Sequence, residues 1–291
     1  MINLTPGFGA LEPKVDLRDY KYSPASVSGK QIELPESFAL TPPSIKDQGT
    51  INSCVAHVAT SIEEYFNARY CNYHDLLSVG YIYGCRYVYT GPGMYLRDAL
   101  KTLQKRGVCT NKEFPYNEEV PAIINLFNTR TSWATDSNNK ITTYFSIDKE
   151  ELQYNMKKAL LEYGPLMVSI RWHSDFTVDK DTHVIKSNFN SSIGLHCVMV
   201  YGWNKDGWLI QNSWGENWGN GGRAVYAFGD PLVEVWGVTD LDIRDDKDMK
   251  NKDTNKVKDF FYKLFSKIIN WFKETYTKIK CKVQNLFRKY F

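Results

Sequence analysis

Residues 48–68 read QGTINSCVAHVATSIEEYFNA, a turn-rich lead followed by an apolar repeat. The spacing of the repeat predicts a helix from Ser53 to Ala68, with Asn52 or Ser53 as its N-cap. Cys54 then lies where loop becomes helix, and a helix N-terminus stabilises the thiolate form of a cysteine. The repeat consists of Val55, Val58, Ala59, Ile62 and Phe66.

A thiolate nucleophile also needs a base and a group that orients the base, and both must come from elsewhere in the chain. His196 opens a strand-like stretch, GLHCVMVYGW, and Asn212 lies in the next one, LIQNSWGENWGNGG. These three residues are therefore the candidates for thiol chemistry. Cys54 with His57 is no half of a metal site, because no second Cys/His pair follows at ligand spacing. We expect no metal and no organic cofactor.

Taken in order, QGTINSC, GLHCVMVYGW and QNSWGENWGNGG resemble the active-site segments of the papain-like (cathepsin-type) cysteine proteases. Each motif alone is a weak signal, but the ordered set is a strong one. The resemblance extends over residues 34–240. DLRDYKYSP in the N-terminal region and the small number of cysteines look most like the bacterial and large-DNA-virus branch.

The resemblance implies a role for each matching residue. Cys54 is the nucleophile, His196 the general base, and Asn212 the residue that orients the imidazole. Gln48 contributes to an oxyanion hole together with the Cys54 backbone N–H. The substrate-binding residues are then Trp214, which shields the Asn212–His196 hydrogen bond, and Gly91 and Gly93, along which the substrate backbone runs.

Two positions depart from the family pattern. Ile51 stands where the family has a disulfide-bonded cysteine, and Val55 stands where it has an aromatic residue. Neither change touches the chemistry, and the missing disulfide is consistent with a reducing compartment.

The two halves of the chain differ in pattern, and this predicts an α+β fold. Helical patterns at residues 53–68 and 95–105 precede a third helix, EELQYNMKKALLEYG, which ends at Gly164. Strand-like stretches bounded by glycine follow it: PLMVSIRW, HCVMVYGW, GWLIQNSW and RAVYAFG. We expect a papain-like two-lobed fold, in which a helical left lobe carries Cys54 and a β-barrel-like right lobe carries His196 and Asn212. An active-site cleft separates the lobes.

The amino-acid composition along the chain divides it into four segments. Residues 1–33 form an N-terminal arm, residues 34–245 the catalytic domain, residues 246–255 a polar linker, and residues 256–291 a basic amphipathic helical tail. The arm is either a passive extension or a pro-segment that lies over the cleft and is removed near Lys30–Glu33. The tail either lies in a membrane interface, packs on the domain or a partner helix, or is largely disordered.

Charge separates the tail from the rest of the chain. From Asp246 to Phe291, 13 Lys and Arg stand against 5 Asp and Glu, whereas residues 1–245 carry 23 against 28. An anionic membrane or a polyanion is thus a candidate partner for the tail only, without specific recognition of nucleic acid. No signal-peptide pattern and no transmembrane span are visible, so we expect a reducing intracellular or virion-interior location. The oligomeric state stays open.

The expected function is endopeptidase activity through a Cys54 thioester, with polypeptides as substrates. Endopeptidase is preferred over carboxydipeptidase, because no His-His pair is available to cover the cleft. The alternative is a catalytically weak papain-fold binding protein tethered by its basic tail. Acyl transfer to an amine or thiol acceptor would use the same residues and also stays open.

Overall fold

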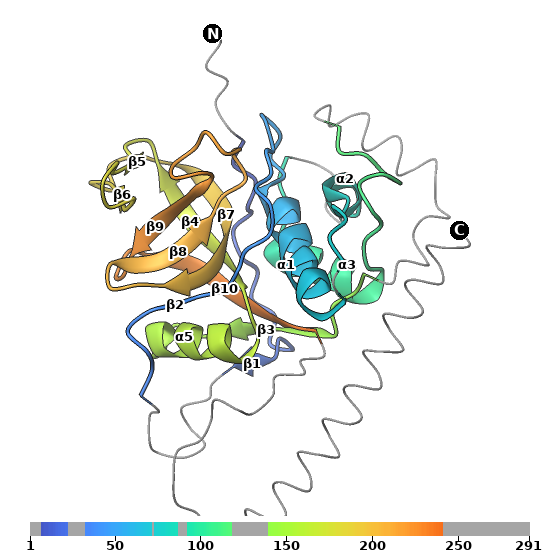
Figure 1. Ribbon diagram of the computed structural model, residues 1–291, viewed down its shortest axis with the longest axis horizontal. Helices are drawn as coiled ribbons and strands as arrows, with labels where there is room; N and C mark the ends of the chain where they lie inside the picture. Colours follow the sequence, from blue (N-terminus) through green and yellow to red (C-terminus); the bar gives the residue numbers. More distant parts are fainter. Residues whose placement is uncertain (1–6, 23–32, 72, 87–91, 118–138, 241–291) are drawn as a thin grey trace, which may run out of the picture. The chain divides into compact units, whose positions relative to one another are not determined.

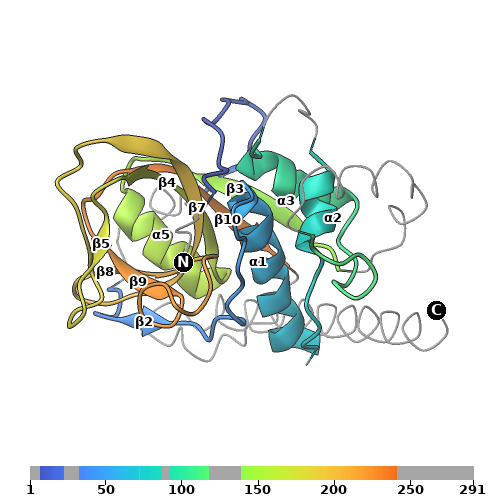
Figure 2. The same ribbon diagram turned by 90° about the horizontal axis from the view of Figure 1, so that it is seen from above.

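The computed structural model describes residues 7–22, 33–71, 73–86, 92–117 and 139–240 (Figure 1). Three helices, α1 (Cys54–Cys71), α2 (Val79–Gly84) and α3 (Leu96–Lys105), lie on one side of a curved sheet. Helix α5 (Leu152–Glu162) lies in the hollow on the other side of the sheet, as the view from above shows (Figure 2). The fold is therefore a mixed α/β arrangement in which strands separate α5 from α1, α2 and α3.

The main sheet connects segments from both ends of the described chain. Its strands are ordered β1-β3-β10-β4-β7-β8-β9, and β2 also pairs with β7. All pairs are antiparallel except β1 with β3, which is parallel. The path does not close among the described strands, so the β-barrel-like lobe is an open curved sheet. The bounds are β1 (Lys21–Tyr22), β2 (Phe38–Ala39), β3 (Thr143–Ile147), β4 (Leu166–His173), β7 (Ser192–Trp203), β8 (Gly207–Gln211), β9 (Arg223–Ala227) and β10 (Leu232–Thr239), with a separate hairpin of β5 (Thr177–Val178) and β6 (Ile185–Lys186).

Two hydrophobic cores share the central strands. Because successive side chains of a strand point to opposite faces, Cys197 and Met199 of β7 join the core around α1, α2 and α3. Val198 and Val200 of the same strand join the core around α5. The side chains of strand β4 alternate between the two cores in the same way, with Met167 in the first core and Leu166 and Val168 in the second. The two-lobed expectation is thus confirmed as two cores, one on each face of β4 and β7.

The predicted helices are present with nearly the expected bounds. Helix α1 begins at Cys54, and the Ser53 carbonyl accepts its first hydrogen bond from the His57 N–H at 3.0 Å. Helix α3 ends before Gly107, which has a φ of 77°, and α5 ends before Gly164, with a φ of 114°. Positive φ is a conformation that glycine adopts without steric cost and that ends helices.

Strands β4, β7, β8 and β9 match the four predicted stretches, whereas β1, β2, β3, β10 and α2 were not predicted. In the described part of the chain no helix is long and apolar enough to cross a membrane. The predicted linker and tail, residues 246–255 and 256–291, lie outside the described residues.

Candidate active site

Cys54 lies at the N-terminus of α1, which packs against β7. Its side chain is fully buried and joins the same core as Cys197 of β7, and backbone groups of Cys197 and of Gly9 in the N-terminal arm favour a lower pKa of the thiol. The helix start thus brings the sulfur to the strand that carries His196, one residue before Cys197.

His196 is held by Asn212. The imidazole Nε2 donates a 2.7 Å hydrogen bond to the Asn212 side-chain oxygen, and both residues are buried. The other ring nitrogen, Nδ1, is buried and makes no hydrogen bond within the described residues. An imidazole with Nε2 fixed by Asn212 and Nδ1 without a partner is oriented to accept a proton at Nδ1.

The loop that follows β8 fixes Asn212 in turn. Its backbone N–H donates to the Gly222 carbonyl at 3.0 Å, and its side-chain oxygen also accepts from the Ser213 N–H at 2.8 Å. Gly222 has a φ of 80°, and a Cβ at this position would lie 2.6 Å from Ile45. Glycine is therefore required for this loop to close beneath the Asn212–His196 pair.

Gln48 is placed by pairing between the segment before α1 and the segment after β8. Its N–H donates to the Ser213 carbonyl at 2.8 Å, and its side-chain oxygen accepts from the Ser213 hydroxyl at 2.6 Å. The amide nitrogen then donates to two carbonyls, that of Ile51 at 2.6 Å and that of Gly7 at 2.8 Å. Every polar atom of this amide is satisfied, which fixes its direction.

The N-terminal arm passes through this site. Besides the Gly7 carbonyl on Gln48, the Gly9 carbonyl accepts from the Met94 N–H at 2.8 Å, and the Ala10 N–H donates to the Leu195 carbonyl at 3.2 Å. A Cβ on Gly9 would lie 2.0 Å from the Asn52 carbonyl oxygen. Only a glycine backbone fits between the arm and the loop that precedes Cys54.

Burial by the arm and the two lobes keeps the site uncharged. Burial raises the pKa of the Cys54 thiol to about 11, although backbone N–H groups at the sulfur oppose the shift. Burial also lowers the pKa of His196 to about 4, and the hydrogen bond to Asn212 opposes this shift. At neutral pH a protonated thiol and a neutral imidazole therefore face the arm.

Phe8, between the two arm glycines, lies in an aromatic pocket. Its ring centroid is 5.9 Å from Trp214, 6.1 Å from His196 and 6.4 Å from Trp172. Trp214 also packs on the His196 ring at 4.6 Å. The arm thus covers both the sulfur and the imidazole.

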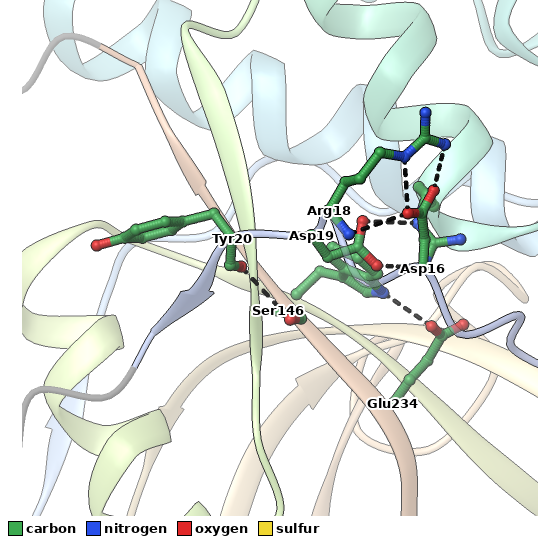
Figure 3. Close-up of polar contacts among 8 residues, drawn as sticks. Asp16, Arg18, Asp19, Tyr20, Ser146 and Glu234 are labelled. Atoms are coloured by element: carbon green, nitrogen blue, oxygen red, sulfur yellow. Dashed lines mark hydrogen bonds and ion pairs between the residues drawn. The ribbon is translucent and has the colours of Figure 1, made fainter.

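A second set of contacts holds the arm farther along. Asp19 receives two hydrogen bonds from the Arg97 guanidinium, and the Tyr20 carbonyl accepts from the Ser146 N–H at 2.9 Å (Figure 3). Tyr22 in β1 is buried against Phe145, at a centroid distance of 5.1 Å. Between the two sets of contacts, Val15 and Leu17 are 90% and 94% exposed.

The structure brings four predicted site residues together and leaves one undescribed. Cys54, His196, Asn212 and Gln48 converge where α1, β7 and the loop after β8 meet, with Trp214 beside them. Gly93 lies next to the arm, since a Cβ there would be 2.8 Å from the Gly9 carbonyl oxygen, whereas Gly91 lies outside the described residues. No group of His, Cys, Asp and Glu in the described ranges could hold a metal ion.

Sequence reasoning missed three contributors to the site. Phe8 and Trp172 form the aromatic contact, and Ser213 orients Gln48. Ser213 could have been suspected, since it directly follows Asn212. Phe8 carried only the weak signal of an aromatic residue between two glycines in a turn-rich arm.

Comparisons with known proteins show the family of the chain. Residues 34–230 match the family described as papain family cysteine protease. A viral cathepsin of Adoxophyes honmai nucleopolyhedrovirus is 28% identical over 203 residues, 65% of this chain and 56% of the relative. Cathepsin B-like CP2 of Giardia intestinalis is 28% identical over 221 residues, 69% of this chain and 72% of that protein. The chain thus spans little more than half of the viral relative.

A solved structure shows the same fold. Xylellain, a cysteine protease from Xylella fastidiosa, superposes with a TM-score of 0.69 at 23% identity, over 81% of this chain and 96% of that one. With a family match over most of the chain and cathepsins among its relatives, the chain belongs to the papain family of cysteine proteases.

Proposed function

We propose that the protein is a cysteine endopeptidase that hydrolyses peptide bonds of polypeptide substrates. The observation that carries the proposal is a stretch of its own chain held in the site. The Gly7 carbonyl accepts from the Gln48 amide, and the Ala10 N–H donates to the carbonyl of Leu195, the residue before His196. A site that grips peptide backbone at these atoms has the contacts that a substrate needs.

The mechanism follows from the positions of these groups. His196 removes the thiol proton, and Cys54 attacks the substrate carbonyl. The amide N–H that Gln48 now gives to Gly7 would stabilise the oxyanion that develops. The imidazolium then protonates the leaving amine, and water activated by His196 hydrolyses the thioester. Asn212, a neutral group, orients the imidazole without adding charge.

The arm is proposed to be an inhibitory pro-segment. In support, residues 7–11 occupy the site, and their burial of Cys54 and His196 opposes the thiolate–imidazolium pair. The cut expected near Lys30–Glu33 falls on residues outside the described part, apart from Glu33. The reducing compartment expected from the cysteine content stays a prediction.

The test of activity combines labelling with turnover. The protein, reduced and freed of its arm, should react with an irreversible epoxysuccinyl thiol inhibitor and hydrolyse a fluorogenic dipeptidyl coumarylamide. Cys54→Ala and His196→Ala should lose both properties. Labelling without hydrolysis would favour the binding or acyl-transfer alternatives.

A second experiment addresses the arm. On incubation under reducing conditions, the active protein should lose its arm, and Cys54→Ala should keep its full mass. Equal trimming of both proteins would argue against self-processing.

A further inference from the structure

The loop from Gln48 to Cys54 carries both donors of the expected oxyanion hole, one at each end. Within the loop, the Ile51 N–H donates to the Gln48 carbonyl at 3.3 Å, and the turn passes through Gly49, which has a φ of 58°. A hydrogen bond of this length is weak. Because both donors must point at the same position to stabilise an oxyanion, their separation depends also on contacts from outside the loop.

The Tyr116 hydroxyl connects the two ends of this loop. It donates to the Gln48 carbonyl at 3.0 Å, and it lies 2.8 Å from the hydroxyl of Ser53, the residue before Cys54. Tyr116 reaches the loop from the segment that follows α3, where its own N–H donates to the Asn111 side-chain oxygen at 3.0 Å. Its ring packs against the core around α1. A single hydroxyl on an anchored ring thus contacts both ends of the loop.

His57 fixes the direction of the second donor. The Cys54 N–H and the Ser53 carbonyl belong to the same planar peptide unit, so a contact to the carbonyl orients the N–H. That carbonyl accepts from the His57 backbone N–H at 3.0 Å and lies 3.1 Å from the His57 Nδ1. Nδ1 is also 3.3 Å from the Ser53 hydroxyl, and the imidazole meets the Tyr116 ring edge-on at 5.0 Å. His57, Ser53 and Tyr116 therefore form one connected group at the loop.

This group contributes position rather than charge. Burial, together with the neighbouring Lys46, lowers the pKa of His57 to about 3, although backbone groups of Ser53 and Asp47 oppose the shift. The imidazole of His57 is therefore uncharged at neutral pH, and the other two members contribute hydroxyl groups. Removal of one of these hydroxyls should thus move the donors without changing how readily the Cys54 thiolate forms.

We propose that Tyr116 is a positioning residue of the oxyanion hole. Its hydroxyl bridges the Gln48 carbonyl and the Ser53 hydroxyl, and so keeps the two donors at the separation that the developing oxyanion requires. The inference rests on the proposed function, in which Gln48 is one of these donors. An interaction made only in the transition state affects kcat rather than KM, so the loss of this hydroxyl should appear in kcat.

The experiment compares two reactions of Cys54 in the full chain carrying Gly9→Ala, which displaces the arm. Coumarylamide hydrolysis passes through an oxyanion, whereas alkylation by iodoacetamide needs the thiolate and forms no oxyanion. Tyr116→Phe should lower the kcat of hydrolysis about 10-fold and leave KM and the alkylation rate within about twofold. Tyr226→Phe is the matched control, since that hydroxyl also donates to a backbone carbonyl, that of Pro231 at 3.1 Å, and its loss should change neither reaction.

A double substitution tests whether Tyr116 acts through Gln48. With Gln48→Ala already present, Tyr116→Phe should lower kcat less than about threefold further, because one of the donors that it positions is gone. Ser53→Ala removes the other end of the bridge and should reproduce the selective loss of kcat. Thermal unfolding checks that each variant is folded, and the Ser53→Ala comparison decides the question if Tyr116→Phe does not fold.

The outcomes separate this inference from the proposed function. An unchanged kcat in Tyr116→Phe, an equal loss of alkylation, or an undiminished loss on top of Gln48→Ala overturns the positioning role, while hydrolysis by the Gly9→Ala parent upholds the protease. If that parent does not hydrolyse the coumarylamide, or if Cys54→Ala hydrolyses it equally well, the proposed function fails and the inference with it.

Discussion

At the residue scale, the covered site holds its two reactive groups in their neutral forms. Burial raises the pKa of Cys54 to about 11 and lowers that of His196 to about 4. Because the thiolate is the nucleophile, the covered protein at pH 7 has very little of the reactive form. Exposure to water removes the cause of both shifts, and the charged pair can then form.

This difference is measurable as a pH profile of alkylation. In the full-length protein, the rate of Cys54 modification by iodoacetamide should still increase with pH at pH values above the ordinary thiol pKa of about 8.5. In Gly9→Ala it should level off at lower pH, because water and the imidazolium stabilise the thiolate. Peptide mass mapping separates Cys54 from the partly exposed Cys109. Superimposable profiles would contradict the role of the arm.

The Gln48 side chain provides a second prediction at this scale. In the Gly9→Ala background, Gln48→Ala should lower kcat about 10²- to 10³-fold, because one oxyanion donor is lost. Gln104→Ala is the control, since the Gln104 amide donates to the Thr142 carbonyl on the surface, away from the candidate site, and the change should leave kcat unchanged. A loss confined to KM would instead assign Gln48 to ground-state binding.

At the element scale, the arm depends on glycine where it passes the loop before α1. A methyl group on Gly9 cannot fit 2.0 Å from the Asn52 carbonyl oxygen. Gly9→Ala should therefore displace residues 7–11 and raise the initial rate of coumarylamide hydrolysis at least about tenfold, if the covered form is mostly closed. Leu17→Ala, a change at a 94% exposed position of the same arm, should not. Equal initial rates for Gly9→Ala and the unaltered chain would show that the arm does not limit access.

The second arm contact is predicted to stabilise β1 rather than the site. Asp19→Asn weakens a part-buried pair with Arg97 and should speed hydrogen exchange of the Ser146 amide, which donates to the Tyr20 carbonyl. Arg18→Ala removes an exposed pair with Asp16, which solvent screens, and should leave this exchange unchanged. Similar exchange in both variants would show that the Arg97 contact does not hold β1.

The sequence predicts those elements whose cause is local. Helix α1 follows from its apolar spacing, and α5 ends where Gly164 permits a positive φ. The short strand β1 cannot be predicted from neighbouring residues, because it is held by the packing of Tyr22 on Phe145, which is far away in the sequence. The contact between Phe8 and Trp172 could not be predicted for the same reason, since the two residues are 164 positions apart in the sequence. The ordered motifs did bring Cys54, His196, Asn212 and Gln48 to attention, and the fold places these residues together.

At the scale of the whole molecule, the arrangement of two cores explains why the candidate site lies where it does. Strand β7 contributes Cys197 to the core around α1 and Val198 to the core around α5. His196 therefore stands on a strand common to both, while Cys54 comes from a helix that belongs to one. The site forms only when both cores are complete, so a core substitution in either should lower activity along with stability.

The last prediction concerns the charge distribution of the entire chain. Residues 246–291 carry an excess of eight positive charges, and the preceding residues an excess of five negative ones. A basic segment next to an anionic surface gains about 1 kcal/mol per Lys or Arg, and salt screens this attraction. Full-length protein should thus sediment with anionic liposomes at low salt, less so with neutral liposomes or at high salt. Deletion of residues 246–291 should abolish the sedimentation, because the remaining chain is net negative and would be repelled. Unchanged sedimentation after the deletion would exclude the tail as a membrane anchor.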